Sequence, residues 1–157
     1  VILYKVNAID PTDVEMLNEY YFETMHHEFA HILHQKKNYP TEYNQISAAD
    51  YSSTGWQNRT EQQAWKLGFV TPYAGMEPQE DFVEVIANYL VKPDGFWENM
   101  LANAGTEGAT KIQTKFDMVK EWLMTAWNID IDELRTIIIR RSGDIDSILN
   151  EKIAYNE

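Results

Sequence analysis

The chain has 157 residues and is acidic, with 13 Lys and Arg against 25 Asp and Glu and a formal net charge of −12. Its 44% hydrophobic and 13% aromatic residues are typical of one globular domain with a buried core, and the charge, without a stripe of Lys and Arg, excludes nucleic acid as a partner. Because the chain contains no Cys, a disulfide framework is excluded and any metal must be held by His and carboxylate side chains.

The first part of the chain predicts a strand followed by a long helix. Residues 1–7 are β-branched and aromatic with partial alternation, which indicates one strand. Asp10 and Pro11 supply the signals of a helix start, and no Pro or Gly interrupts the sequence from Asp13 to Gln35. We therefore expect one helix from about residue 13 to about residue 35.

Two further helices are predicted after an irregular stretch, residues 36–59. Thr60 is a suitable cap for a short helix that Gly68 closes. Pro78 then opens a longer helix, which runs to about Val91 before a Pro-Asp-Gly sequence ends it.

The last third of the chain predicts two more helices. The first covers residues 107–127 and has apolar side chains at spacings of three and four: Ile112, Phe116, Val119, Leu123 and Trp127. Asp130 and Glu133 form the pattern of a capping box, which opens a final helix ending near Gly143. No apolar run approaches the ~20 residues that a membrane-spanning helix needs. The pattern predicts a single, mostly helical domain with a small strand component at most.

The second half of the first long helix contains a zinc-site pattern, His27-Glu28-Phe29-Ala30-His31. Residues four apart in an α-helix lie on one face, so the two imidazoles can hold one ion at about 2.0–2.1 Å. Zinc lowers the pKa of a water molecule bound to it toward ~7, and Glu28 can accept the proton as that water attacks a carbonyl group. The pattern therefore predicts zinc-dependent hydrolysis with Glu28 as general base. A chance occurrence of the pattern in a protein-interaction module is one alternative.

A catalytic zinc ion needs a third protein ligand, and His34 is the first candidate. On a continuous helix His34 lies about 10 Å along the axis from His27, at ~1.5 Å rise per residue. One ion can reach both only if the chain turns sharply after His31, and no Gly permits such a turn. We therefore favour the interpretation of His34 as a polar residue near the end of the helix.

The acidic start of the helix at Pro78 offers a better third ligand. Glu80 and Glu84 share a face, so one can bind the metal while the other orients a ligand histidine. Spacing alone prefers Glu80 only mildly over Asp81 or Glu84, because acidic residues in a first turn also suit the helix dipole without any metal.

The two motifs resemble the gluzincin branch of zinc metallopeptidases: His27-Glu28-Phe29-Ala30-His31 followed by Glu80-Asp81-Phe82-Val83-Glu84. The resemblance is closest to the zinc-binding metallopeptidases of Bacteroidetes, lipoproteins encoded with SusC/SusD-type nutrient-uptake systems. In that family an HExxH helix is followed by a helix of the type Glu-Asp-Phe-Ala-Glu, and Val83 stands here in place of the usual Ala. The resemblance covers roughly residues 1–100 by motif and order.

The chain also has a more distant likeness to the catalytic domain of anthrax lethal factor. That domain has a Tyr seven residues before its Glu ligand and a second Glu four residues after it, positions that Tyr73, Glu80 and Glu84 occupy here. The likeness implies Glu80 as the third zinc ligand, with His27 and His31, and the phenol of Tyr73 as a group that stabilises the oxyanion in the transition state.

The resemblance implies a zincin-like metallopeptidase domain of the α+β class, predominantly α-helical, with one zinc ion per chain and a peptide or protein as substrate. It also implies a place in the bacterial envelope, as an outer-membrane lipoprotein near nutrient-uptake components. Because the chain begins Val1-Ile2-Leu3 without a Met or a signal peptide, we expect residues 1–157 to be a single catalytic domain from a longer precursor.

A non-catalytic, zinc-containing accessory protein of a polysaccharide or nutrient-uptake system is the rival function. Glu28 discriminates between the two, because a merely structural zinc site has no use for a base beside its first ligand. Gluzincins often hold the substrate on a sheet, and only residues 1–7 have strand character here, so we expect substrate binding by this part of the protein to be incomplete.

Overall fold

The computed structural model describes residues 10 and 12–154 of the chain. In chain order its elements are α1 (Val14–Met16), the π-helix η2 (Leu17–Phe22), α2 (Glu23–Lys36), the 3-10 turns η3 (Thr41–Gln45) and η4 (Gly55–Asn58), α3 (Glu61–Leu67), the 3-10 turn η5 (Tyr73–Gly75), α4 (Pro78–Val91), α5 (Phe96–Asn103), α6 (Gly105–Trp127) and α7 (Ile131–Ala154). The prediction of a mainly helical fold is confirmed for these residues, and no strand occurs among them. The strand predicted for residues 1–7 lies outside them.

The long helix predicted from residue 13 to residue 35 is present as three consecutive segments: the α-helix α1, the π-helix η2 and the α-helix α2. It begins at Asp13, whose Oδ1 accepts a hydrogen bond of 2.9 Å from the backbone N–H of Met16. The π-helical segment between α1 and α2 is not predicted by the sequence pattern. Such segments are rare and often occur at functional sites, and here the segment immediately precedes the helix that carries His27.

Local sequence signals set the ends of α3 and α4. Thr60 and Gln63 form a reciprocal capping box at the start of α3, with N–H···O distances of 3.3 Å to Thr60 Oγ1 and 2.9 Å to Gln63 Oε1. Gly68 ends α3 with a φ of +89°, and an added Cβ there would lie 2.5 Å from Lys111 Cβ. Pro78 is the first residue of α4, so both predicted helices are confirmed.

The C-terminal half differs from the prediction in two places. A short helix, α5, follows directly after Gly95, in a stretch for which the sequence predicts no element. The prediction that the last helix ends near Gly143 is wrong, because α7 continues to Ala154. One exposed Gly costs a helix only about 1 kcal/mol, which is too little to end it. The cap itself is as predicted: Asp130 Oδ1 accepts from the backbone N–H of Asp132 at 2.9 Å and of Glu133 at 3.2 Å.

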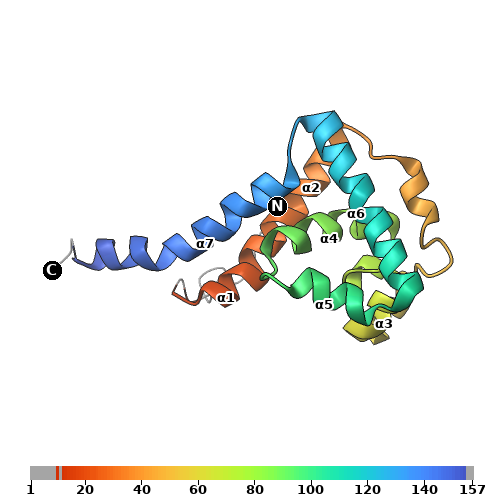
Figure 1. Cartoon of the computed structure of the whole chain (residues 1–157), viewed down its shortest axis with the longest axis horizontal. Coiled ribbons are helices and arrows are strands. Elements are labelled where there is room, and N and C mark those ends of the chain that lie inside the picture. Colours follow the sequence, from red (N-terminus) through yellow and green to blue (C-terminus); the bar gives the residue numbers. More distant parts are fainter. Residues whose placement is uncertain (1–9, 11, 155–157) are drawn as a thin grey trace.

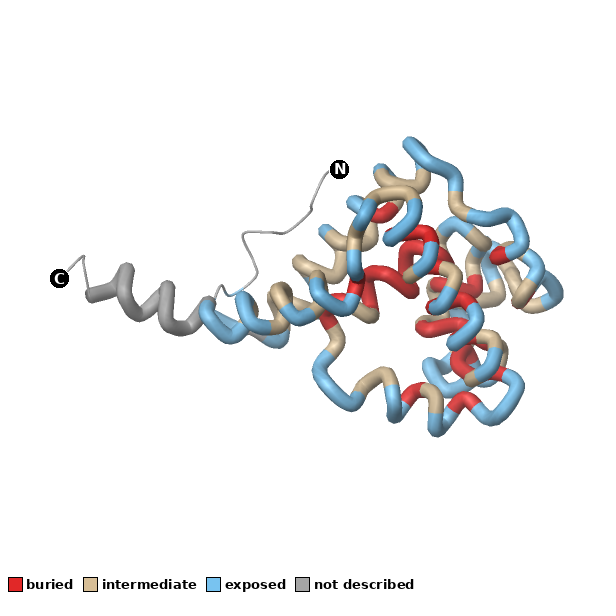
Figure 2. Tube along the Cα trace, turned by 45° about the horizontal axis from the view of Figure 1, so that its top comes forward, coloured by how far each residue is buried: buried red, intermediate tan, exposed pale blue. Residues whose placement is uncertain are grey.

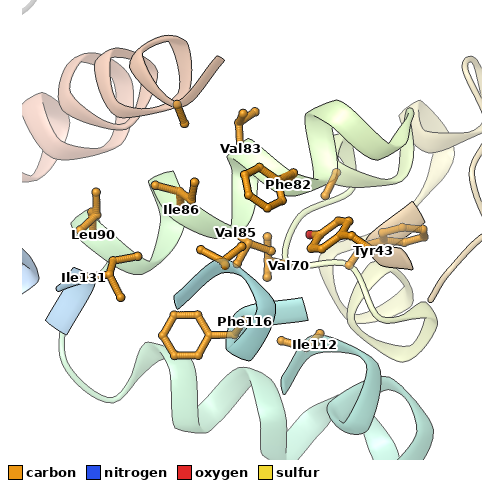
Figure 3. Packing of buried hydrophobic residues seen from close by; sticks show 14 of the residues in the cluster. Tyr43, Val70, Phe82, Val83, Val85, Ile86, Leu90, Ile112, Phe116 and Ile131 are labelled. Carbon is orange, nitrogen blue, oxygen red and sulfur yellow. The ribbon is translucent and has the colours of Figure 1, made fainter. Parts of the chain in front are cut away.

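Helix α4 forms the centre of the core (Figure 3). Ten of its fourteen residues are buried, and it contacts α2, α6 and α7. Val85 lies on the face of α4 that is turned toward Phe116 of α6, whereas Val83 lies on the opposite face of α4 (Figure 3). Because most of its residues are buried, the position of α4 is set by helices on several sides at once.

Helix α7 starts against α4 and then extends away from the rest of the fold toward its C-terminal end (Figure 1). Buried residues gather in the part of the fold built from α2 to α6 (Figure 2), and among the described side chains of α7 only Ile131 is buried. Arg135 holds the start of α7 to α4, since its guanidinium donates to the carbonyl of Tyr89. Among the described residues, no helix is both long and apolar enough to cross a membrane.

A completely buried ion pair joins the first turn of α4 to α6. Lys115 Nζ lies 2.6 Å from Asp81 Oδ2, and neither side chain is exposed to solvent. Tyr51 donates to the same carboxylate oxygen at 2.6 Å, and Lys115 also donates to the carbonyl of Gly68 at 2.7 Å. Burial raises the pKa of Asp81 and lowers the pKa of Lys115, while the charge of each partner opposes the shift of the other. Each charge is therefore tolerated only because the other is present.

This ion pair leads to a prediction about stability. Lys115→Met leaves the Asp81 carboxylate buried without its cation, and we expect the free energy of unfolding to fall by about 3–5 kcal/mol. Urea denaturation measures the change. The control is Lys120→Met, which breaks a pair with Asp132 whose side chains are 41% and 49% exposed and should cost less than about 1 kcal/mol. Small and equal losses of unfolding free energy in both variants would contradict the role of Lys115 as the cation that Asp81 needs.

Candidate metal centre

Helices α2 and α4 bring three side chains together in the way the sequence predicts. His27 Nε2 lies 3.1 Å from His31 Nε2 and 3.1 Å from Glu80 Oε2, and His31 Nε2 lies 3.5 Å from Glu80 Oε2. Two atoms bound at about 2.0–2.1 Å to one tetrahedral ion are about 3.4 Å apart. The triangle therefore has the size of one face of a tetrahedral zinc site, and its three residues could hold a metal ion.

The hydrogen bonds of His27 leave its Nε2 free for a metal. Its Nδ1 donates to Glu84 Oε1 at 2.8 Å, which places the proton on Nδ1 and a lone pair on Nε2. Glu80 Oε2, which faces this lone pair, is buried and has no hydrogen-bond partner among the described residues. A lone pair on each of these two atoms would be repulsive, so the position between them suits a cation, either a proton or a metal ion.

The electrostatics of the site also favour a cation at His27. Burial by itself lowers the pKa of His27, but the hydrogen bond to Glu84 and the charges of Glu84, Glu80 and Glu28 outweigh it, so the pKa is raised. An environment that holds a proton on this ring more tightly than water does also attracts a metal ion to it.

Glu84 lies behind the ligand face rather than in it. Its Oε2 accepts a hydrogen bond of 2.6 Å from Thr71 Oγ1, and Asn88 Nδ2 lies 3.4 Å from the same atom. Thr71 Oγ1 in turn accepts from the backbone N–H of Ala74 at 3.1 Å, which ties the turn η5 to this carboxylate. Of the alternatives that spacing left open, the structure places Glu84 as the hydrogen-bond partner of His27, a candidate ligand, and turns Asp81 into the core.

His34 is not beside the triangle. Its Nε2 lies 3.0 Å from His31 Nδ1, on the opposite edge of the His31 ring from Nε2, so it cannot share the same ion. As expected, His34 is a polar residue in the last turn of α2, and the helix also places it against His31, one of the candidate ligands. The signal for this contact was present in the sequence as the three-residue spacing from His31.

Tyr73 lies at the edge of the site, on η5. Its ring centroid is 6.0 Å from that of His27 and 5.0 Å from that of Trp56. Burial, followed by the neighbouring charge of Glu80, raises the pKa of Tyr73 to about 12. The phenol therefore keeps its proton at neutral pH and remains a hydrogen-bond donor.

A polar hollow of about 280 Å³ opens beside the triangle. His27, Glu28 and Tyr73 line it, together with Glu84, Thr24, Glu23 and Glu19. A larger hollow of about 620 Å³ lies between η2, the end of α4 and α7 and contains none of the predicted site residues. The smaller hollow is the relevant one for chemistry, because both the candidate base, Glu28, and one of the candidate ligands, His27, line it.

Comparisons with known proteins agree with this geometry. Over residues 1–132 the chain matches the sequence model of a family described as "Putative zinc-binding metallo-peptidase". The crystal structure of a "putative zinc-binding metallo-peptidase" from Bacteroides caccae ATCC 43185 is 52% identical in sequence, with a TM-score of 0.85 over 90% of this chain and 54% of that chain. This chain therefore spans about half the length of that relative. No curated protein matches it.

The geometry leads to a prediction about zinc binding. We expect one zinc ion per chain, with binding abolished in His27→Ala and in His31→Ala. Glu80→Ala should weaken the affinity by far more than the ~10–100-fold that is typical of residues behind the ligands, and Glu84→Ala should fall within that range. Zinc titration against a competing chelator measures each affinity.

His26→Ala is the matched control for this titration, because it removes a histidine of the same helix that lies outside the triangle. Its affinity should equal that of the wild type. Full zinc occupancy in His27→Ala or His31→Ala, or an unchanged affinity in Glu80→Ala, would show that the ion binds elsewhere.

Proposed function

The chain belongs to the family described as "Putative zinc-binding metallo-peptidase", and we propose that it hydrolyses peptide bonds in a zinc-dependent reaction with Glu28 as general base. The observation that supports this proposal is the position of the triangle formed by His27, His31 and Glu80. It lies beside a hollow that is lined by a carboxylate, Glu28, and a protonated phenol, Tyr73. A purely structural site needs neither group and has no use for an open side.

In this proposal the ligand triangle binds zinc, which lowers the pKa of water and polarises a carbonyl group. Glu28 follows His27 directly in α2, so its carboxylate reaches the hollow without belonging to the triangle. Glu28 takes the proton of the attacking water and then delivers it to the nitrogen of the leaving amine. Glu84 keeps the proton of His27 on Nδ1, so that Nε2 stays available to the metal.

Tyr73 has a separate part in the proposal. Peptide hydrolysis develops negative charge on the carbonyl oxygen, and a donor aimed at that oxygen stabilises the transition state more than the bound substrate. The raised pKa of Tyr73, about 12, keeps the phenol protonated for this purpose. Its turn is connected through Thr71 to Glu84, so the donor and the ligand histidine are held by one hydrogen-bonded network.

We predict that Glu28→Gln retains zinc but loses hydrolysis by roughly a hundredfold or more in kcat/KM. The amide keeps the shape of the side chain and removes the base, whose contribution is typically 10²–10⁴-fold. Turnover of a mixed peptide library, with zinc added and then chelated, provides the assay.

Glu19→Gln is a suitable control, because Glu19 lines the same hollow without adjoining a ligand, and its turnover should stay within a few-fold of the wild type. Hydrolysis by Glu28→Gln at the wild-type rate would exclude Glu28 as the base. A zinc-loaded wild type that hydrolyses no peptide of the library would instead favour the non-catalytic accessory function.

We predict that Tyr73→Phe lowers kcat by up to about 10²–10³-fold, the range for loss of one oxyanion donor, with little change in KM or in zinc affinity. A group that acts only on charge developing in the transition state should show this pattern. Steady-state kinetics on the peptide that is cleaved fastest measures both constants. Tyr20→Phe, at a tyrosine that is 61% exposed, is the control. Equal kcat values for Tyr73→Phe and the wild type would reduce Tyr73 to a packing residue.

We also propose that the protein acts in the bacterial envelope as a lipoprotein, near outer-membrane nutrient-uptake components. The support is the resemblance of the two motifs to SusC/SusD-associated metallopeptidases and the bacterial origin of the structural relative. Fractionation of cells that express the natural gene tests this, and recovery of the protein in the cytoplasm would reject it.

A further inference from the structure

The two candidate ligand histidines have different partners on the side away from the metal. His27 Nδ1 lies 2.8 Å from a carboxylate oxygen of Glu84. His31 Nδ1 lies 3.0 Å from Nε2 of His34, another imidazole. When a histidine binds metal through Nε2, its proton is on Nδ1 and needs an acceptor, because that hydrogen bond fixes both the tautomer and the plane of the ring.

His34 has the geometry to be this acceptor. It is three residues after His31 on α2, so one helix carries both the ligand and its partner. With the proton of His31 on Nδ1, the lone pair of His34 Nε2 receives it, and neither ring needs a net charge.

The ring of His34 is itself held in place by aromatic side chains. It packs edge-to-face against Tyr39, with centroids 5.7 Å apart, and against Phe82, with centroids 6.4 Å apart. Tyr39 and Phe82 stack on each other at 4.2 Å, and Tyr39 Oη donates to Asn44 Oδ1 at 3.0 Å. Phe82 is fully buried in α4, two residues after Glu80. The support for His31 therefore comes from both helices of the site.

A neutral acceptor also suits the charge of this site. Glu80, Glu84 and Glu28 already surround the two ligand histidines with negative charge. A second carboxylate at His31 Nδ1 would add to it, whereas an imidazole orients the ring without adding charge.

We propose that His34 is a positioning residue of the zinc site, which accepts the Nδ1 proton of His31 and fixes the orientation in which His31 binds the metal. The proposal rests on the zinc site formed by His27, His31 and Glu80, and it is independent of whether the site hydrolyses peptides.

The test compares two substitutions of His34 by zinc titration of the whole chain against a competing chelator. His34→Leu fills similar space and removes the acceptor, and its zinc affinity should fall about 10–100-fold. His34→Gln can place its amide oxygen near the position of Nε2, and its affinity should stay within a few-fold of the wild type. Rescue by Gln but not by Leu is a result that a purely packing role would not produce.

Two further measurements separate the possible failures. Urea denaturation of the metal-free variants should give free energies of unfolding for His34→Leu and His34→Gln that lie within about 1 kcal/mol of each other, since both variants lose the same aromatic contacts. His27→Ala in the same titration reports on the zinc site itself. If the wild type binds zinc and His27→Ala does not, equal affinities of the Leu and Gln variants overturn the role of His34 alone. If the wild type binds no zinc, both the site and the role of His34 are overturned.

Discussion

The buried pair of Asp81 and Lys115 is the constraint on which the geometry of the site depends. Neither charge is exposed, and the cost of burying one without the other is large, so the first turn of α4 must lie where Lys115 on α6 can reach it. Glu80 precedes Asp81 directly. A shift of α4 that moved Glu80 away from the histidines of α2 would also separate the ion pair, and the energy that keeps the core together therefore also keeps the third candidate ligand in place.

Much of the fold follows from signals that act within a few residues. Thr60 with Gln63, Pro78 and Asp130 each start a helix where the sequence predicts one, because capping satisfies backbone groups locally. The elements that the sequence did not predict depend on weaker or longer-range effects. The π-helical segment η2 has no local signature, α5 follows a sequence that normally breaks helices, and α7 continues through Gly143.

The candidate site likewise has a part that local helix geometry predicts and a part that only packing decides. The shared face of His27 and His31 follows from helical geometry alone, and their Nε2 atoms do converge. The choice among Glu80, Asp81 and Glu84 could not be made from spacing, because it depends on how α4 is rotated about its axis. Packing decides that rotation: the buried face takes Asp81 to Lys115, Glu80 then faces Nε2 of His27, and Glu84, one turn later, reaches the Nδ1 edge of the same ring.

The surroundings of the two histidines make the site asymmetric, and this asymmetry bears on where chemistry can occur. His31 Nδ1 faces His34 and the aromatic rings that support it, and His31 does not line the hollow. His27 borders the hollow that Glu28 and Tyr73 also line. A base that takes a proton from water and a donor that meets a developing oxyanion are useful only where water and a carbonyl group can enter. In this chain both groups line the hollow beside His27, whereas the groups around His31 Nδ1 are suited to orienting that ring.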